Sequence, residues 1–234
     1  MQRYFAKEYN GKLILHDSDI HHIKNVMRMK NNDTIEVVYN NKLYICSINE
    51  IEPLSLDIKE VIEEENKINL DITIAIGLVK EQKMDLILQK LTELGVNRII
   101  PVSMERSIVK LDKNKFEKKK VRWETICKEA SEQSHRVTIP KIEKIMTMKE
   151  LLNNKKQLNL ICSLNDMTKP LQEYLINGLQ DILFVVGPEG GFSPNEEAFL
   201  IDNGFEPTTL GKRVLRVETA AIYVASIINY VYKG

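Results

Sequence analysis

Three glycines, a proline and a glutamate stand together in the stretch GPEGG at residues 187–191. They directly follow DILFVV (181–186), an apolar run that predicts a buried strand. Because glycine has no Cβ, a ligand can approach the backbone of such a loop very closely. The stretch therefore predicts recognition of a flat or polar ligand by main-chain groups. A plain turn that leads into a helix explains the same glycines and stays open as the alternative.

The sequence lacks the two common phosphate-binding glycine patterns. Neither the P-loop pattern GxxxxGK[ST] nor the dinucleotide pattern GxGxxG occurs in it. Neither of these two familiar patterns therefore explains the glycine loop.

A second reactive stretch is LGKRVLRVETA (210–220), a basic loop that runs into an apolar segment. Arg216 lies at the junction, where a guanidinium can stabilise negative charge on a substrate oxygen. A structural ion pair with Glu189 or Glu218 is the alternative role for Arg216. The following helix, expected at 218–233, is apolar nearly all round, which predicts burial on two sides and a subunit interface.

The elements that must position these stretches alternate between strand and helix from residue 68 onward. Strands are expected at 68–79, 97–104, 159–164, 181–187 and 207–211, and helices at 83–96, 114–136, 195–204 and 218–233. Such alternation predicts a mostly parallel sheet covered on both faces, with ligands beyond the carboxyl ends of the strands.

Residues 1–67 differ, because they contain short strands, a tight turn at Asn40-Asn41 and one helical stretch at 18–29. We therefore expect a small β-barrel at 1–67, with 62–67 as an acidic linker, and an α/β domain at 68–234.

Composition and charge narrow the classes of function. The 234 residues carry a net charge of +0, but a basic run lies at 110–123 and is either a solvated helix face or a footprint for a polyanion. Without an apolar run of membrane-spanning length or a signal peptide, a cytoplasmic protein is expected. Neither a disulfide framework nor a metal site is expected from the scattered Cys46, Cys127 and Cys162.

At this point the motifs support a resemblance. GPEGGFS with Glu196, together with LGKRVLRVETA, resembles the two C-terminal motifs of the bacterial 16S rRNA (uracil-N3) methyltransferase family, in the SPOUT class of knotted methyltransferases. Further matching stretches are HHIKNVMR (21–28), QKLTELGV (89–96), ERS (105–107) and EASEQSHR (129–136). The departures, NND at 31–33 and Leu91-Thr92, do not touch the chemistry.

The resemblance implies a PUA-like barrel, an α/β domain with a trefoil knot, and a homodimer. It implies methyl transfer from S-adenosylmethionine to N3 of a uridine in 16S rRNA. Two competing hypotheses stay open: the same enzyme class acting on a tRNA or on a ribose 2′-hydroxyl, and a non-catalytic RNA-binding module.

 

Arg216 is the expected catalytic group, because it lies just after the expected cofactor loop, and the resemblance implies roles for further residues. Ten residues are expected to hold S-adenosylmethionine: Leu164, Gly187, Glu189, Gly190, Gly191, Leu210, Gly211, Val214, Leu215 and Thr219. Seven are expected to contact 16S rRNA, within the assembled small subunit: Arg3, His22, Arg28, Lys83, Arg106, Arg122 and Arg136. Solvated charges, or ion pairs within the chain for Arg106 and Arg136, are the alternatives for this second set.

Overall fold

The structure, a computed structural model, describes residues 1–63, 70–164 and 168–233. The chain divides into two compact units: the first contains Met1–Lys67 and Lys128–Ile139, and the second contains Ile68–Cys127 and Pro140–Gly234. The expected linker at 62–67 and the expected boundary at 67/68 lie largely outside the described residues. Lys128–Ile139, which the sequence placed in the second domain, is part of the first unit.

The first unit is built on a mixed five-stranded sheet with the order β2-β1-β3-β4-β5. Its elements are β1 (Arg3–Tyr9), β2 (Lys12–Leu15), α1 (Asp17–His21), the π-helix η1 (His22–Val26), β3 (Thr34–Tyr39), β4 (Lys42–Ile51) and β5 (Leu54–Ile62). Asn40 and Asn41 have φ values of 51° and 59°, as the expected tight turn between β3 and β4 requires. Apolar side chains of the strands and of Ile23 form its core.

Lys128–Ile139 joins this unit through partly buried polar contacts and an apolar contact. Lys128 Nζ lies 2.6 Å from Asp19 Oδ1 and 2.7 Å from Glu132 Oε1. The Phe5 amide donates to Glu132 Oε1 at 3.3 Å, and Val137 packs with Val38. The helix α3 (Lys113–Gln133) therefore contributes residues to both units.

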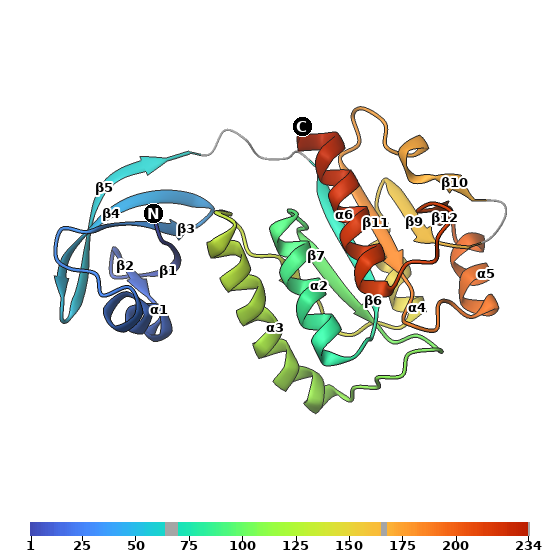
Figure 1. Ribbon diagram of the computed structural model, residues 1–234, viewed down its shortest axis with the longest axis horizontal. Helices are drawn as coiled ribbons and strands as arrows, with labels where there is room; N and C mark the ends of the chain where they lie inside the picture. Colours follow the sequence, from blue (N-terminus) through green and yellow to red (C-terminus); the bar gives the residue numbers. More distant parts are fainter. Residues whose placement is uncertain (64–69, 165–167, 234) are drawn as a thin grey trace. The chain divides into compact units, whose positions relative to one another are not determined.

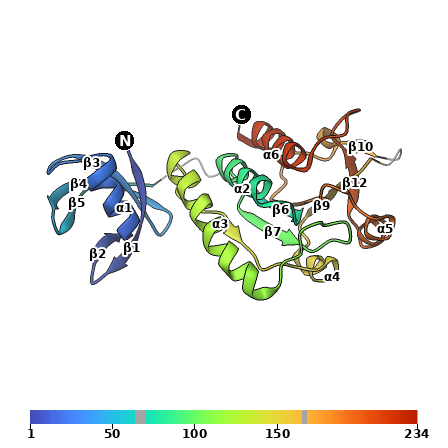
Figure 2. The same cartoon turned by 60° about the horizontal axis from the view of Figure 1, so that its bottom comes forward.

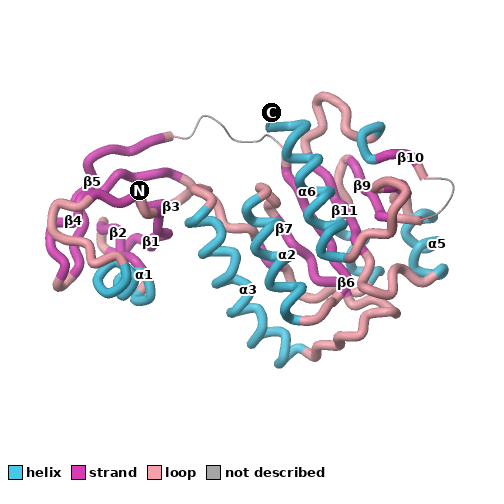
Figure 3. Tube along the Cα trace, viewed as in Figure 1, coloured by secondary structure: helices cyan, strands magenta, loops and turns pink. Residues whose placement is uncertain are grey.

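The second unit has a seven-stranded parallel sheet with the order β10-β12-β9-β11-β6-β7-β8. The strands are β6 (Asp71–Gly77), β7 (Arg98–Val102), β8 (Lys141–Ile142), β9 (Leu158–Cys162), β10 (Lys169–Pro170), β11 (Asp181–Val186) and β12 (Glu206–Thr209). Besides α3, the helices are α2 (Glu81–Glu93), α4 (Met148–Leu151), η2 (Leu152–Asn154), η3 (Leu171–Glu173), α5 (Pro194–Asp202) and α6 (Val217–Lys233). Figure 3 shows how strands and helices alternate along this unit.

Helices cover both faces of this sheet, because the strands are apolar on both sides. Ile182, Phe184 and Val186 of β11 face one cluster, which includes apolar residues of α2, α3 and α6. Leu183 and Val185 face the other cluster, which contains Leu151 of α4 and Leu200 of α5. Figure 1 shows α2 and α6 side by side, and Figure 2 shows them again from a second direction.

The predicted fold class is confirmed in its two parts, a mostly β first unit and an α/β second unit with a parallel sheet. Threading of the chain end through a trefoil knot stays a prediction. Strands β12, β9 and β11 are direct neighbours and run parallel, so their carboxyl ends lie at one edge of the sheet. The loops that follow these three strands are the loops that the sequence singled out.

Candidate active site

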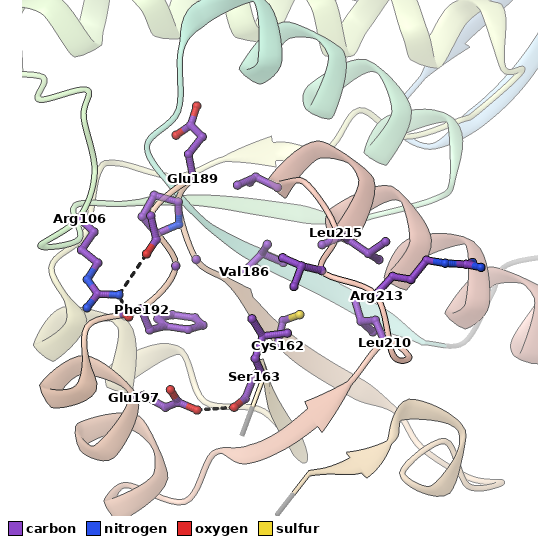
Figure 4. Close-up of a pocket in the computed structure, with 18 of the residues that line it drawn as sticks. Arg106, Cys162, Ser163, Val186, Glu189, Phe192, Glu197, Leu210, Arg213 and Leu215 are labelled. Atoms are coloured by element: carbon purple, nitrogen blue, oxygen red, sulfur yellow. Dashed lines mark hydrogen bonds between the residues drawn. The ribbon is translucent and has the colours of Figure 1, made fainter. Parts of the chain in front are cut away.

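A cavity of about 360 Å³ lies at the carboxyl ends of β9, β11 and β12. Nine of the ten residues expected to hold the cofactor line it: Leu164, Gly187, Glu189, Gly190, Gly191, Leu210, Gly211, Val214 and Leu215. Thr219 is exposed in the first turn of α6 and is not among the lining residues. The structure thus brings together three loops that are distant in sequence (Figure 4).

The glycine loop is a tight turn that packs against its own chain. The Gly191 amide donates to the Pro188 carbonyl at 2.8 Å, and Gly191 has a φ of +67°. A Cβ on Gly187 would lie 3.1 Å from the Phe192 nitrogen, and one on Gly190 would lie 3.0 Å from the Arg106 Cβ. A side chain at Gly187 or Gly190 would therefore crowd its neighbours, so close packing favours glycine at these positions.

Gly77, at the end of β6, supports the same loop from below. A Cβ at this position would lie 2.6 Å from the Pro188 nitrogen and 2.7 Å from its Cδ. The neighbouring strand end therefore fixes where the glycine loop begins.

Helix α5 begins with a capping box directly after the loop. Ser193 Oγ accepts from the Glu196 amide at 3.3 Å, and Glu196 Oε2 accepts from the Ser193 amide at 3.0 Å. With Pro194 at the first helical position, this start agrees with the sequence pattern. The cap fixes the direction in which the chain leaves the glycine loop.

Arg216 is exposed just before α6 and does not line the cavity. The alternative role, an ion pair with Glu189 or Glu218, is not present among the described residues, because both carboxylates face Lys83. Lys83 Nζ lies 3.3 Å from Glu189 Oε1 and 3.6 Å from Glu218 Oε2. In Figure 4 the Glu189 side chain points away from Cys162 and Ser163.

Sequence reasoning missed a polar wall of the cavity. Cys162, Ser163 and Glu197 line it, and Ser163 Oγ donates to Glu197 Oε1. Burial, followed by the charge of Glu197, raises the pKa of the Cys162 thiol to about 11. Cys162 and Ser163 directly precede Leu164, so their place at the strand end could have predicted them as lining residues. Nothing in the sequence around Glu197 indicates that it lines the cavity.

The seven residues expected to contact RNA are placed in different surroundings. Arg3 is buried, and its guanidinium donates hydrogen bonds to the Glu36 carboxylate and to the His135 carbonyl. His22 Nδ1 shares a 2.9 Å hydrogen bond with the Tyr4 hydroxyl. Arg28 and Arg122 are exposed, although Arg122 Nη2 lies 2.8 Å from Asp85 Oδ2. Arg106 contacts the glycine loop, and Arg136 donates to Thr138 Oγ1 at 3.2 Å.

The cavity fits S-adenosylmethionine in size and in character. Its volume lies within the usual range for small-molecule sites. Apolar side chains of Leu210, Leu215 and Phe192 form much of the wall, and Glu197 adds a carboxylate. An apolar wall suits a flat adenine, and a carboxylate suits a cationic sulfonium.

The described residues also bear on metal binding and on membrane insertion. Across residues 1–63, 70–164 and 168–233, no group of three or more His, Cys, Asp or Glu side chains is arranged to hold a metal ion. None of the described helices combines the length and apolar character of a membrane span.

Comparison with known proteins agrees with this geometry. The family described as RNA methyltransferase domain matches residues 65–229, and the RNA methyltransferase PUA domain matches residues 15–61. The chain is 33% identical to ribosomal RNA small subunit methyltransferase E of Bacillus subtilis, across 98% of this chain and 96% of the relative.

Solved structures extend the comparison to the fold. The ribosomal RNA small subunit methyltransferase E of Neisseria gonorrhoeae, solved with S-adenosyl methionine, is 30% identical with a TM-score of 0.88, and the match covers 99% of this chain and 98% of that one. A Legionella pneumophila protein in complex with the cofactor SAM is 33% identical with a TM-score of 0.89, and that match covers 97% and 96% of the two chains. This chain therefore belongs to the RNA methyltransferase family that contains the ribosomal RNA small subunit methyltransferases E.

Proposed function

We propose that this protein methylates N3 of a uridine in the 16S rRNA of the small ribosomal subunit, with S-adenosylmethionine as methyl donor. The observation that carries the proposal is the cavity formed by the three motif loops, which nine of the ten expected cofactor residues line. Relatives across the full length of the chain are named for small subunit rRNA methylation.

S-adenosylmethionine, when bound, supplies an electrophilic methyl group on a sulfonium. The protein must then make N3 of uracil nucleophilic, and N3 carries a proton at neutral pH. Arg216 is proposed to stabilise the uracil anion through a carbonyl oxygen, and its exposed position beside the cavity supports this role. Because N3 is buried in a Watson–Crick pair, the target uridine must be unpaired or turned out of its helix.

A homodimer is part of the proposal. Helix α6 buries Ala221, Val224 and Ile228 in the core of its own unit, but Tyr223 and Tyr230 remain 45% and 80% exposed. These two tyrosines are seven residues apart and so lie on one face of the helix. An exposed aromatic stripe on α6, the helix whose Val217 and Ala220 line the cavity, supports a second subunit at this face.

RNA contact is proposed for the exposed basic residues first. Arg28 and Lys118 are exposed, and neither forms an ion pair with any of the described residues. Basic side chains of this kind neutralise phosphates without reading sequence.

The test is methyl transfer from isotopically labelled S-adenosylmethionine to small subunits and to naked 16S rRNA that lack the modification. We expect labelled 3-methyluridine by nucleoside mass spectrometry, and the two substrates show whether the assembled subunit is required. A different labelled nucleoside would retain the enzyme class and change the target. A folded protein that transfers no label and binds no cofactor would favour a non-catalytic RNA-binding module.

A further inference from the structure

The segment Met104–Ser107 lies against the glycine loop and also contacts the start of α5. Its sequence, MERS, follows β7, and Arg106 lines the cavity while Met104 belongs to the apolar cluster under the loop. The segment is thus placed to determine the position of the loop.

Arg106 bonds to two carbonyl groups of the loop. Its Nη1 donates to the Gly190 oxygen at 3.2 Å and to the Phe192 oxygen at 2.9 Å. These carbonyls lie on either side of Gly191, so one guanidinium nitrogen fixes the backbone on both sides of the residue with positive φ. Figure 4 shows Arg106 beside this loop, joined to it by a dashed line.

Glu196 makes the reciprocal contact from α5. Its Oε1 accepts from the Glu105 amide at 2.7 Å, while its Oε2 accepts from the Ser193 amide. A cation on the segment therefore bonds to backbone of the loop, and an anion after the loop bonds to backbone of the segment. Hydrogen bonds to charged groups are stronger than those between neutral groups.

We propose that Arg106 and Glu196 are positioning residues for the cofactor loop, and that Arg106 acts there instead of as an RNA contact. The inference rests on the proposed function only in naming the ligand of the cavity. Without these contacts the glycine loop loses its fixed carbonyl directions, and the cavity loses the shape that the ligand requires.

Three variants, of which one is Glu196→Gln, and one control test the proposal in the full-length protein. Arg106→Met keeps much of the aliphatic stem but removes the donors, Arg106→Lys keeps the charge, and Arg122→Met removes an exposed arginine far from the loop in sequence. Titration calorimetry measures the Kd for S-adenosylmethionine, and filter binding measures affinity for naked 16S rRNA without cofactor.

We expect Arg106→Met to raise the Kd for S-adenosylmethionine by about tenfold or more, in line with the loss of charge-assisted hydrogen bonds. Arg106→Lys should recover part of this loss, Glu196→Gln should fall between them, and Arg122→Met should leave the Kd unchanged. In steady-state kinetics the KM for the cofactor should rise more than kcat falls. An unchanged cofactor Kd in Arg106→Met, with a lowered affinity for RNA, would overturn the proposal.

Hydrogen exchange without cofactor separates this inference from the proposed function. The amides of residues 189–192 should exchange faster in Arg106→Met than in the unaltered protein, while amides of β11 keep their protection. Unchanged exchange in the loop rejects the positioning role whatever the protein binds. Faster exchange in a protein that binds no S-adenosylmethionine would retain the positioning role and reject the proposed ligand.

Discussion

Lys83 of α2 lies 3.3 Å from Glu189 of the glycine loop, and the same ammonium lies 3.6 Å from Glu218 at the start of α6. One cation therefore connects α2, the glycine loop and the start of α6, and the last two contribute lining residues to the cavity. Both Glu189 oxygens are buried and have no hydrogen-bond partner among the described residues, so Lys83 is the charge that compensates them. This relationship favours a structural role for Lys83 over the RNA contact that the sequence predicted.

Replacing Lys83 with methionine should therefore lower stability more than RNA binding. We expect the free energy of unfolding to fall by about 1–2 kcal/mol, less than for a fully buried pair, because the Lys83 side chain is 32% exposed. Urea unfolding measures the change. Lys118→Met, at an exposed position on α3, is the matched control and should change stability little. A stable Lys83→Met variant that binds rRNA poorly would return Lys83 to the RNA interface.

Arg216→Ala should reduce kcat and leave the affinity for S-adenosylmethionine unchanged. The guanidinium lies outside the cavity lining, so the cofactor does not need it, whereas loss of one group that stabilises developing charge costs about 100-fold or more in rate. Single-turnover methyl transfer and calorimetry separate the two effects. Arg216→Lys should retain an intermediate rate. Normal methyl transfer by Arg216→Ala would remove Arg216 from the mechanism.

Local sequence patterns predicted the cavity well, because its main walls are loops that directly follow apolar strands. Gly187, Leu164 and Leu210 each mark such a strand end. Contacts between distant segments were not predictable in this way. Lys128 pairs with Asp19 across 109 positions, and Arg106 contacts Gly190 across 84. The sequence shows that these residues are charged, but it does not show which distant side chain or main-chain group will lie next to them in the fold.

Gly77→Ala should damage the cofactor site from beneath it. An added Cβ would lie 2.6 Å from the Pro188 nitrogen, so the glycine loop must move. We expect the Kd for S-adenosylmethionine to rise by about tenfold or more, since small displacements in a site have large effects. Gly178→Ala is the control, because its φ of +84° makes alanine strained while no atom lies within 4 Å of the added Cβ. That variant should lose stability and keep its cofactor affinity.

Cys162 gives a direct test of where the cofactor binds. Cys46 and Cys127 are fully buried, whereas Cys162 is partly exposed in the cavity wall. Burial and Glu197 raise the pKa of the Cys162 thiol to about 11, so alkylation by iodoacetamide should accelerate with pH up to that value, beyond the ordinary 9.0. Saturating S-adenosylmethionine should slow the labelling of Cys162, as peptide mass spectrometry will show. Equal labelling with and without cofactor would place the ligand elsewhere.

Arg3 and Glu36 should make the first unit sensitive to acid. Burial raises the pKa of Glu36, but hydrogen bonds and charge from Arg3, and then from His135, outweigh it and hold the pKa below its ordinary 4.5. A carboxyl with a lowered pKa in the folded state contributes stability above its unfolded pKa and loses it as pH falls through the folded value.

The free energy of unfolding should therefore fall below about pH 4.5, and Glu36→Gln should reduce this dependence on pH. Urea unfolding of the unaltered protein and of Glu36→Gln, in steps of about one pH unit from about pH 3 to about pH 7, measures this free energy. If Glu36→Gln keeps the full acid dependence while Arg3→Ala weakens only RNA binding, then Arg3 acts as the RNA contact that the family resemblance implied.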